Sequence, residues 1–486
     1  MRALRTLAFA LAAVALLVVP RAPVVSAAAT QPSITTVAAD DVHTCALTST
    51  GAVRCWGGNG FGQLGNGTTT KSPVPVDLSR MHGGFASITT GANHTCALTV
   101  AGRVWCWGRG ESGELGTGRQ VRYAFPVAVA GLSSGVRSLS AGQGHTCALT
   151  TTGAVKCWGE NAYGQLGTGT TLTGLAPAVV NGLSSGVISV SAGGLSTCAV
   201  TSGGGVLCWG DNLNGELGDG TTTNSSLPVR VSGLASGVRA ISVGGGRACA
   251  LTSVGGVTCW GGGAGDAGTV PTAVPGLASG ATAISVGGGH ACALRNDGRV
   301  TCWGANGFGQ LGDGTTVGSS LPVEVADLAG GATAIAAGGS HTCAVSSGGQ
   351  VQCWGGNAYG QLGAGSVSSA RHTPTTVDFV VYQMVGLSPS VHAGIVDRGT
   401  TVRFTAMVRP RGPASVRPVV RFVVYRRVAG AWRLDATRDV AADAQGNVSL
   451  RWGFVTPGLR YVRARALADS AYGASAWGPL VTYDVR

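Results

Sequence analysis

The sequence predicts an all-β protein built from one repeated unit. Seven times along the chain a Cys is followed ten residues later by a second Cys, and Trp-Gly follows the second Cys. The first Cys of successive pairs are 51 residues apart, except for one step of 43. Glycine makes up 82 of the 486 residues and charged residues only 11%, and the repeats carry no long apolar stripe of helical period. A fixed period of this size predicts a solenoid or a propeller.

Each Cys pair predicts a β-hairpin. In the first unit, residues 43–57 form two short β-prone segments around a turn that contains glycine. An odd-length loop centred near residue 50 places Cys45 opposite Cys55 and Leu47 opposite Val53, at a separation that a disulfide can span. The seven pairs are Cys45 with Cys55, Cys96 with Cys106, Cys147 with Cys157, Cys198 with Cys208, Cys249 with Cys259, Cys292 with Cys302, and Cys343 with Cys353.

The rest of each unit completes a blade of about four strands. A Gly-rich loop of the form Asn-x-x-Gly-Gln-Leu-Gly follows the hairpin, and the segments Pro-Val-x-Val and Gly-Leu-x-Ser-Gly-Val come next. Short strands with Gly-rich turns predict a propeller, and seven blades close a ring that buries an apolar face between neighbours. We expect closure to mix the termini, with residues 33–38 pairing with the seventh unit, because that unit lacks its trailing segment after Val377.

The full repeat resembles that of a known family. The string Gly-x-x-His-Thr-Cys-Ala-Leu-Thr-x-x-Gly-x-Val-x-Cys-Trp-Gly-x-Asn-x-x-Gly-Gln-Leu-Gly is similar to the repeat of the regulator-of-chromosome-condensation family, over about residues 34–379. The resemblance implies a seven-bladed β-propeller. The functions known in that family differ: a nuclear guanine-nucleotide exchange factor for Ran that also binds chromatin, ubiquitin-ligase modules, and a secreted bacterial inhibitor of β-lactamase.

The N-terminus predicts export. Arg2 and Arg5 precede the apolar run of residues 7–19, and residues 25–27 (Val-Ser-Ala) offer small side chains for signal peptidase. We therefore interpret residues 1–27 as a signal peptide and residues 28–379 as the propeller of a secreted or cell-surface protein, with an uncleaved N-terminal anchor as the alternative. No other stretch approaches the roughly 18 apolar residues of a membrane span.

Export favours disulfides for the paired cysteines. In an oxidising compartment each pair closes a small loop and stabilises the fold by about 2–3 kcal/mol in the chain-entropy model, less where the hairpin is already local. Reduced, buried cysteines are the alternative reading. A zinc site is disfavoured because zinc ligands usually stand two to four residues apart.

Two further repeated residues are interpreted as structural. A His two positions before the first Cys occurs in five units, and Ser196 and Arg247 replace it in the fourth and fifth. We expect it to make a structural hydrogen bond, and consider a metal ring of these His the weaker alternative because the imidazoles would have to converge near the axis. The Trp after each second Cys is expected to pack in the core or between blades.

Departures from the repeat are the better guide to function. No catalytic constellation and no cofactor-binding motif occur in the propeller sequence, which argues against an enzyme. In the fifth unit 11 positions separate Trp260 from Pro271, against 19 in units one to four and six, so its Asn-x-x-Gly-Gln-Leu-Gly loop is missing and we expect a notch there. The second unit carries aromatic and Arg side chains in place of small ones, and we nominate as a partner-binding patch Trp105, Arg122, Tyr123 and Phe125. Ordinary variation of a loop is the alternative reading.

The chain changes character after about residue 379. The Cys-Trp-Gly motif stops, and apolar residues alternate with polar ones in residues 402–408, 420–424 and 448–454. We predict that residues 380–486 form a small β-sandwich that resembles bacterial immunoglobulin-like or fibronectin-like modules. Residues 377–486 hold 15 Arg, no Lys and 7 Asp, so this basic region could bind an anionic cell-wall polymer; a solvated Arg face is the alternative.

Two functional hypotheses follow. The favoured one is a non-catalytic secreted or cell-surface scaffold whose propeller rim binds a protein or a glycan. The alternative by family resemblance is a guanine-nucleotide exchange factor, and an extracellular enzyme inhibitor is a special case of the first. The export signal and the paired cysteines argue against an exchange factor and against nucleic acid as a partner.

Overall fold

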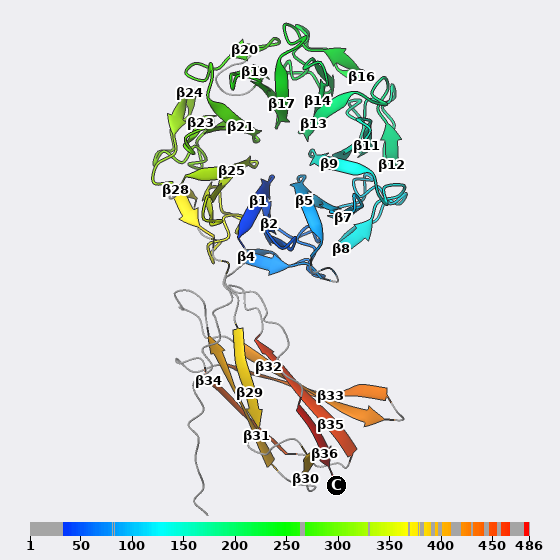
Figure 1. Ribbon diagram of the computed structural model, residues 1–486, viewed down its shortest axis with the longest axis vertical. Coiled ribbons are helices and arrows are strands. Elements are labelled where there is room, and N and C mark those ends of the chain that lie inside the picture. The colour runs from blue at the N-terminus through cyan, green and yellow to red at the C-terminus, as the bar shows by residue number, and fades with distance from the viewer. Residues whose placement is uncertain are drawn as a thin grey trace, which may run out of the picture. The chain divides into compact units, whose positions relative to one another are not determined.

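Seven four-stranded antiparallel sheets stand like blades around a common axis in the computed structural model (Figure 1). The structure describes residues 33–379, apart from residues 80, 82, 263–267, 329–330, 368–369 and 378, together with eight strands between residues 383 and 485. The predicted all-β, seven-bladed propeller is confirmed. The predicted signal peptide, residues 1–27, lies outside the described residues.

Strands of equal position in the blades have nearly equal lengths, except the outermost strand of the fifth blade. The innermost strands are β1 (Ile34–Ala39), β5 (Phe85–Thr90), β9 (Val136–Ala141), β13 (Val187–Gly193), β17 (Val238–Val243), β21 (Ala281–Val286) and β25 (Ala332–Ala337). The second strands are β2 (His43–Thr48), β6 (His94–Thr99), β10 (His145–Thr150), β14 (Ser196–Thr201), β18 (Arg247–Thr252), β22 (His290–Arg295) and β26 (His341–Ser346). The third strands are β3 (Val53–Gly57), β7 (Val104–Gly108), β11 (Val155–Gly159), β15 (Val206–Gly210), β19 (Val257–Gly261), β23 (Val300–Gly304) and β27 (Val351–Gly355). The outermost strands are β4 (Ser72–Asp77), β8 (Tyr123–Ala128), β12 (Gly174–Val179), β16 (Ser225–Arg230), β20 (Thr272–Ala273), β24 (Ser319–Glu324) and β28 (Arg371–Thr376).

The predicted hairpin register is confirmed. Cys45 pairs with Cys55 and Leu47 with Val53 across β2 and β3, and the other six hairpins repeat this pairing of the cysteines. All seven pairs form disulfides, with Cα atoms 4.0–4.1 Å apart, and no described cysteine is free. The bonds join Cys45 with Cys55, Cys96 with Cys106, Cys147 with Cys157, Cys198 with Cys208, Cys249 with Cys259, Cys292 with Cys302, and Cys343 with Cys353. The predicted pairing is therefore present in every blade, between the second and third strands, and the alternative of reduced cysteines is not.

The expected mixing of termini at ring closure is wrong. Strand β1 pairs with β2 of its own blade, and the seventh blade has its own four strands, β25 to β28. The physical reason is local: residues 40–42 reverse the chain directly after β1, and antiparallel strands joined by a short connection pair with each other. The N-terminal segment still contacts the seventh blade, because Ile34 N donates a hydrogen bond to Gly349 O at 3.2 Å.

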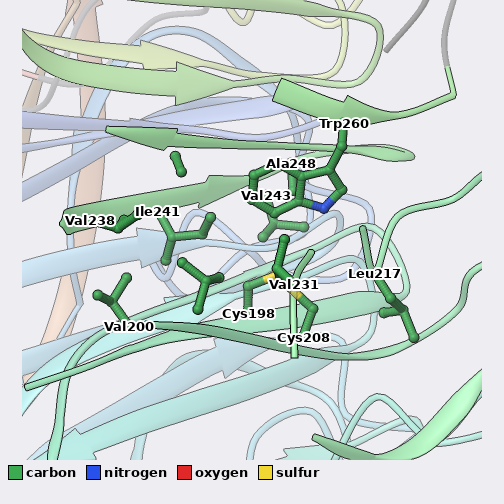
Figure 2. Close-up of a cluster of buried hydrophobic side chains, with 12 residues drawn as sticks. Cys198, Val200, Cys208, Leu217, Val231, Val238, Ile241, Val243, Ala248 and Trp260 are labelled. Carbon is green, nitrogen blue, oxygen red and sulfur yellow. A yellow bond between two sulfur atoms is a disulfide. The ribbon is translucent and has the colours of Figure 1, made fainter. Parts of the chain in front are cut away.

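Apolar side chains fill each space between neighbouring blades. Figure 2 shows the cluster between the fourth and fifth blades, where the Cys198–Cys208 disulfide and Leu217 of one blade face Ile241 and Trp260 of the next. Trp260 is fully buried, as are the equivalent tryptophans of most other blades. The prediction that these tryptophans pack between blades is confirmed, and burial of such large side chains is the main apolar stabilisation of the ring.

The fifth blade has a short outer edge. Its outermost strand, β20, has two residues, where each other blade has six. The expected shortening of this blade is therefore present at its outer edge.

The C-terminal region also forms strands where alternation predicts them. They are β29 (Gln383–Pro389), β30 (Gly394–Val396), β31 (Thr401–Arg409), β32 (Val419–Val428), β33 (Ala431–Ala441), β34 (Asn447–Gly453), β35 (Gly458–Ala466) and β36 (Val481–Val485). One sheet has the order β29-β31-β34 and the other β30-β36-β35-β32-β33. That these two sheets pack as a sandwich stays a prediction.

Intact mass tests the disulfide framework. Alkylation of the unreduced protein should add no label, and alkylation after reduction should add 14, because all 14 cysteines are paired. Mass spectrometry of the protein recovered from its native compartment measures both. Labels on the unreduced protein would contradict the framework.

Candidate functional site: blade interfaces, central channel and rim

One main-chain carbonyl joins each blade to the next at six of the seven interfaces. In the first interface, Gln63 O accepts hydrogen bonds from Trp107 Nε1 at 2.9 Å and from Thr95 Oγ1 at 2.8 Å. The equivalent indole donors at the other interfaces are Trp56, Trp158, Trp209, Trp260 and Trp354, and their acceptors are the carbonyls of Gln361, Glu114, Gln165, Glu216 and Gln310. The loop of one blade is thereby fixed on the core of the next.

The repeated histidine bonds to the same threonine. His43 Nε2 lies 2.8 Å from Thr95 Oγ1 of the next blade, and four further His–Thr pairs repeat this contact at 2.7–2.8 Å. Each threonine donates its single proton to the carbonyl, so its oxygen must accept from the imidazole. The five histidines are therefore neutral with the proton on Nε2. The prediction of a structural hydrogen bond is confirmed.

Burial keeps these imidazoles uncharged. Together with the neighbouring His94 and His341, burial lowers the pKa of His43 to about 3. Burial likewise lowers the pKa of the other four to about 3 or 4. The Nδ1 atoms are buried without a hydrogen-bond partner among the described residues. A charged imidazole would have no counter-charge there, which fits a structural role.

The histidine and the threonine are missing together. Where the fourth and fifth blades carry Ser196 and Arg247 in place of histidine, the blades that follow carry Ala248 and Ala291 in place of threonine. Removing one partner alone would leave a buried polar group unsatisfied, whereas replacing both avoids this cost. The interfaces from the fourth to the sixth blade thus lack this polar link.

The Asn-x-x-Gly-Gln-Leu-Gly loop holds itself together. In the third blade, Asn161 Nδ2 donates to Thr170 O and Leu172 O at 2.9 Å, and Asn161 Oδ1 accepts from Leu166 N. Gln165 Oε1 accepts from Tyr163 N at 3.0 Å. These side chains satisfy backbone groups, and they fix the carbonyl that the next blade uses.

A cavity of about 300 Å³ lies among the innermost strands. Hydroxyl groups ring it in five blades, and each accepts a hydrogen bond from a main-chain N–H of the next blade at 2.9–3.2 Å. They are Thr89, Ser140, Ser191, Ser242 and Ser285. Because these hydroxyl oxygens already accept a bond, their first role is to join neighbouring blades.

Two carboxylates mark one mouth of this channel. Asp40 and Asp41 stand in the first blade where the equivalent pair in the fourth blade is Gly193 and Gly194. A Cβ on Gly193 would lie 2.1 Å from Val243 O, so the close approach of the next blade requires glycine there. Burial and the charge of Asp41 raise the pKa of Asp40, and burial raises that of Asp41. The pair is the main break in the symmetry of the channel.

The structure brings together two of the four nominated patch residues. The rings of Tyr123 and Phe125 meet edge to face, with centroids 5.8 Å apart, on the outermost strand β8. Trp105 instead stacks with Arg103, whose Cζ lies 4.8 Å from the ring centroid, and packs towards the cluster shared with the first blade. Tyr123 packs towards the cluster shared with the third blade. Arg122 is exposed next to Tyr123.

An ion pair lies on the same blade. Arg109 Nε is 3.2 Å from Glu114 Oε1, and Glu114 is almost fully buried. Glu114 replaces the Gln of other loops and, like it, accepts from a main-chain N–H, here Ser112 N at 2.8 Å. Burial raises the pKa of Glu114, which Arg109 opposes. The pair supports the loop and does not resemble a catalytic dyad.

Across the described ranges, no group of three or more His, Cys, Asp or Glu is placed to hold a metal ion. The same part of the chain contains no helix of the length and apolarity needed to cross a membrane. What the described residues offer is a rigid ring with a polar channel, an acidic channel mouth and an aromatic rim.

Seven four-stranded blades, joined through repeated Trp, His and loop carbonyls, define a repeat propeller. The model of the RCC1-like domain matches residues 16–269, and models of the regulator of chromosome condensation repeat match residues 297–345, 281–310 and 332–361. The chain belongs to the regulator of chromosome condensation (RCC1) repeat family.

Its relatives are binding or regulatory propellers with different roles. The chain is 32% identical over 335 residues to the ultraviolet-B receptor UVR8 of Arabidopsis thaliana, a match that covers 68% of this chain and 67% of the receptor. It is 37% identical over 204 residues to the human E3 ubiquitin-protein ligase HERC2, which covers 41% of this chain and 4% of the ligase.

Solved structures show the same fold. Human WBSCR16 matches with a TM-score of 0.58 and 25% identity, covering 64% of this chain and 86% of that one. Prp20p from Saccharomyces cerevisiae, described with its binding to Gsp1p and histones, matches with a TM-score of 0.61 and 22% identity, covering 68% and 87%. At this identity the second likeness concerns the fold alone.

The sequence analysis missed two features that the sequence does contain. When the units are aligned, Asp40-Asp41 occupies the position where four other units have Gly-Gly, shortly before the position of the repeated His. The same alignment shows that a unit without His is always followed by a unit without Thr. The double role of the loop carbonyl has no side-chain signature and needed the structure.

Removal of one threonine hydroxyl tests the His–Thr link. Thr95→Val should lower the stability by about 1–3 kcal/mol, because the imidazole N–H of His43 is left buried without an acceptor. The thermal midpoint measures the loss. The control is Thr99→Val in the same strand, whose hydroxyl makes an exposed bond to Arg103 O. Equal losses in the two variants would contradict the assigned role.

Acid should destabilise the propeller. The histidines have a pKa near 6.5 when unfolded and of about 3 or 4 when folded, so the unfolded state binds more protons between these values. Stability present above pH 6.5 should therefore fall as the pH falls, by at most about 1.4 kcal/mol per pH unit for each histidine. The raised pKa values of Asp40, Asp41, Glu114 and Asp211 oppose this trend, but the five histidines outnumber these four carboxyls. A thermal midpoint that stays constant from pH 7 to 4.5 would contradict the assignment.

Proposed function

We propose that this protein is an exported, non-catalytic binding scaffold whose propeller engages a protein or glycan partner. The observation that carries the proposal is the set of seven disulfides, one in every hairpin. Disulfides persist in oxidising compartments, which agrees with the predicted signal peptide. A ring of blades whose hairpins are each stapled by a disulfide suits binding, because a preorganised surface loses little conformational entropy on association.

The repeat itself indicates where a partner would contact the ring. The described scaffold groups recur from blade to blade, whereas the aromatic pair Tyr123 and Phe125 stands on the rim of the second blade only. Aromatic side chains are enriched at the centres of protein interfaces. The carboxylates Asp40 and Asp41 give the channel mouth a negative charge that would favour a basic group of the partner.

The family offers other activities that the cysteines disfavour. Exchange of guanine nucleotide on a small GTPase takes place where reducing agents keep thiols free, and Prp20p, whose binding to Gsp1p is described, shares only the fold at 22% identity. Inhibition of an extracellular enzyme remains a special case of the proposed scaffold. The basic region of residues 377–486 would add attraction to an anionic cell-wall polymer.

Capture by the purified protein tests the proposed function. Immobilised full-length protein should retain a specific partner from the culture medium or cell-envelope fraction of its source. The double variant Tyr123→Ala, Phe125→Ala should stay folded and lose the partner, because both rings are half-buried on the outermost strand of the blade. The control is Val254→Ala, an exposed apolar residue in the fifth blade.

Each result of this experiment has a defined meaning. Capture that survives the double variant removes the rim of the second blade as the binding surface. Absence of any retained protein or glycan, with folded bait of the expected mass, contradicts the scaffold proposal.

A further inference from the structure

The loop of each blade rests on a fixed surface of the following blade. For the loop of the third blade, Gln165 O accepts from Trp209 Nε1 at 2.9 Å, and four residues later Gly169 N donates to Ser226 O of strand β16 at 2.9 Å. A Cβ on Gly167 would lie 2.8 Å from the same indole nitrogen, so this position requires glycine. The loop thus offers a carbonyl, a glycine and an N–H at fixed spacing.

The same arrangement recurs at five other interfaces. The main-chain N–H donors, four residues after each Gln or Glu, are Gly67, Gly118, Gly220, Gly314 and Gly365. Four of them donate to the second residue of the next blade's outermost strand, and Gly220 donates to Thr269 O, shortly before β20. The Leu after each Gln or Glu is buried in all six loops. The chain therefore shows six times which segment fits this surface.

The sixth blade keeps the receiving surface, but the fifth blade lacks the loop that would rest on it. Strands β16 and β24 both begin Ser-Ser-Leu-Pro-Val, so Ser320 stands where Ser226 does, and Trp303 stands where Trp209 does. Within the described residues, Trp303 Nε1 and Ser320 O have neither of the two recurring partners. The preceding connection, residues 262–268, reads Gly-Gly-Ala-Gly-Asp-Ala-Gly and contains no Gln, Glu or Leu.

The receiving residues of the sixth blade are more exposed than their equivalents in the fourth blade, as a missing loop predicts. Trp303 is 4% exposed, whereas Trp209 is fully buried. Ser320 is exposed, whereas Ser226 is half-buried, and Leu321 is 56% exposed. Among the described residues, Trp303 thus lacks the acceptor that every other tryptophan of the series has, although it is nearly as buried as they are.

We propose that this blade-six site, formed by Trp303 and strand β24, binds a turn-forming segment of a partner protein that carries Gly-Gln-Leu-Gly or Gly-Glu-Leu-Gly, as the chain's own loops do. The carbonyl of Gln or Glu accepts from the Trp303 indole, the second glycine lies against that indole, and an N–H four residues beyond the Gln or Glu donates to Ser320 O. This inference rests on the proposed function, because it names the class of partner that the scaffold takes.

The required chemistry favours a peptide over a glycan. Trp303 Nε1 needs an acceptor and Ser320 O needs a donor, and a peptide main chain supplies a C=O and an N–H at the required spacing, with the Leu side chain between them. Edge strands commonly bind peptides through such main-chain hydrogen bonds. The contact has one bond fewer than five of its six internal counterparts, because Ala291 replaces the threonine that donates to the loop carbonyl there, as Ala248 does at the interface of the fourth and fifth blades.

A peptide taken from the chain itself tests the site. The probe is Asn-Ala-Tyr-Gly-Gln-Leu-Gly-Thr-Gly, residues 161–169, added to the purified full-length protein. It should bind saturably and shift one indole N–H resonance, assigned to Trp303 by its loss in Trp303→Phe. That variant should weaken binding by about fivefold to tenfold, the value of one hydrogen bond. A peptide with valine at the position of Gly167 should not bind, because its side chain would meet the indole.

Two control variants distinguish binding at this site from non-specific binding of the peptide. Trp209→Phe removes an indole whose site is already filled by the chain's own loop, so peptide binding should be unchanged. A graft that replaces residues 262–268 with residues 211–225 of the fourth blade supplies the missing loop, and should raise the thermal midpoint and abolish peptide binding. The proposal is overturned if the peptide fails to bind, binds equally well with valine, or still binds the graft.

The peptide assay does not depend on the natural partner, so the two proposals can fail separately. Peptide binding without any captured partner would sustain the site and contradict the scaffold function. Partner capture that the graft leaves unchanged, together with absent peptide binding, would sustain the scaffold and reject the site.

Discussion

The propeller depends on one main-chain carbonyl in each of six blades, which accepts a hydrogen bond from an indole and, at five interfaces, from a threonine hydroxyl of the next blade. Gln63 O, bonded to Trp107 and Thr95, shows the arrangement. A carbonyl oxygen has two lone pairs, and both are used here away from water. The rest of the loop holds this carbonyl in place, because its Asn and Gln side chains form hydrogen bonds with backbone groups that the turn leaves unpaired. The position of the loop in one blade is thereby set by the core of the next.

The disulfides and the inter-blade network act at different levels. Each disulfide lies within one hairpin and joins residues ten positions apart, so it cannot hold the ring shut. Closure depends on Thr44 and Trp56 of the first blade, which bond to His341 and to Gln361 O of the seventh, and on Phe379, whose ring meets Trp56 edge to face at 5.6 Å. The covalent links make each blade robust, whereas ring closure rests on non-covalent contacts that recur at most other interfaces.

The sequence predicted most of the fold because the repeat amplifies a local signal. Facing positions such as Cys45 and Cys55 follow from turn length alone, and seven copies leave no doubt about the period. Closure was predicted wrongly, because pairing of β1 with β2 is decided by a short turn and the missing segment after Val377 has no bearing on it. Of the nominated patch, Tyr123 and Phe125 lie together, whereas Trp105 packs to the other side of its blade. Which face of a strand packs against which neighbour requires the register, and composition does not supply it.

The interface between the fifth and sixth blades shows what remains when recurring links are removed. It lacks the His–Thr bond, the indole–carbonyl bond and the loop-to-strand bond within the described residues, yet its apolar cluster around Leu277 and Trp303 is intact. Ser242 still accepts from Val286 N, and Arg239 donates to Ala281 O. Apolar contact and the inner hydroxyl thus suffice to keep two blades together, since burial of apolar area is the larger and less directional contribution to stability. The polar links therefore fix how neighbouring blades are aligned and contribute less to the stability of the interface. A blade that has lost its loop can leave the receiving surface of the next blade without its usual partner while the ring stays closed.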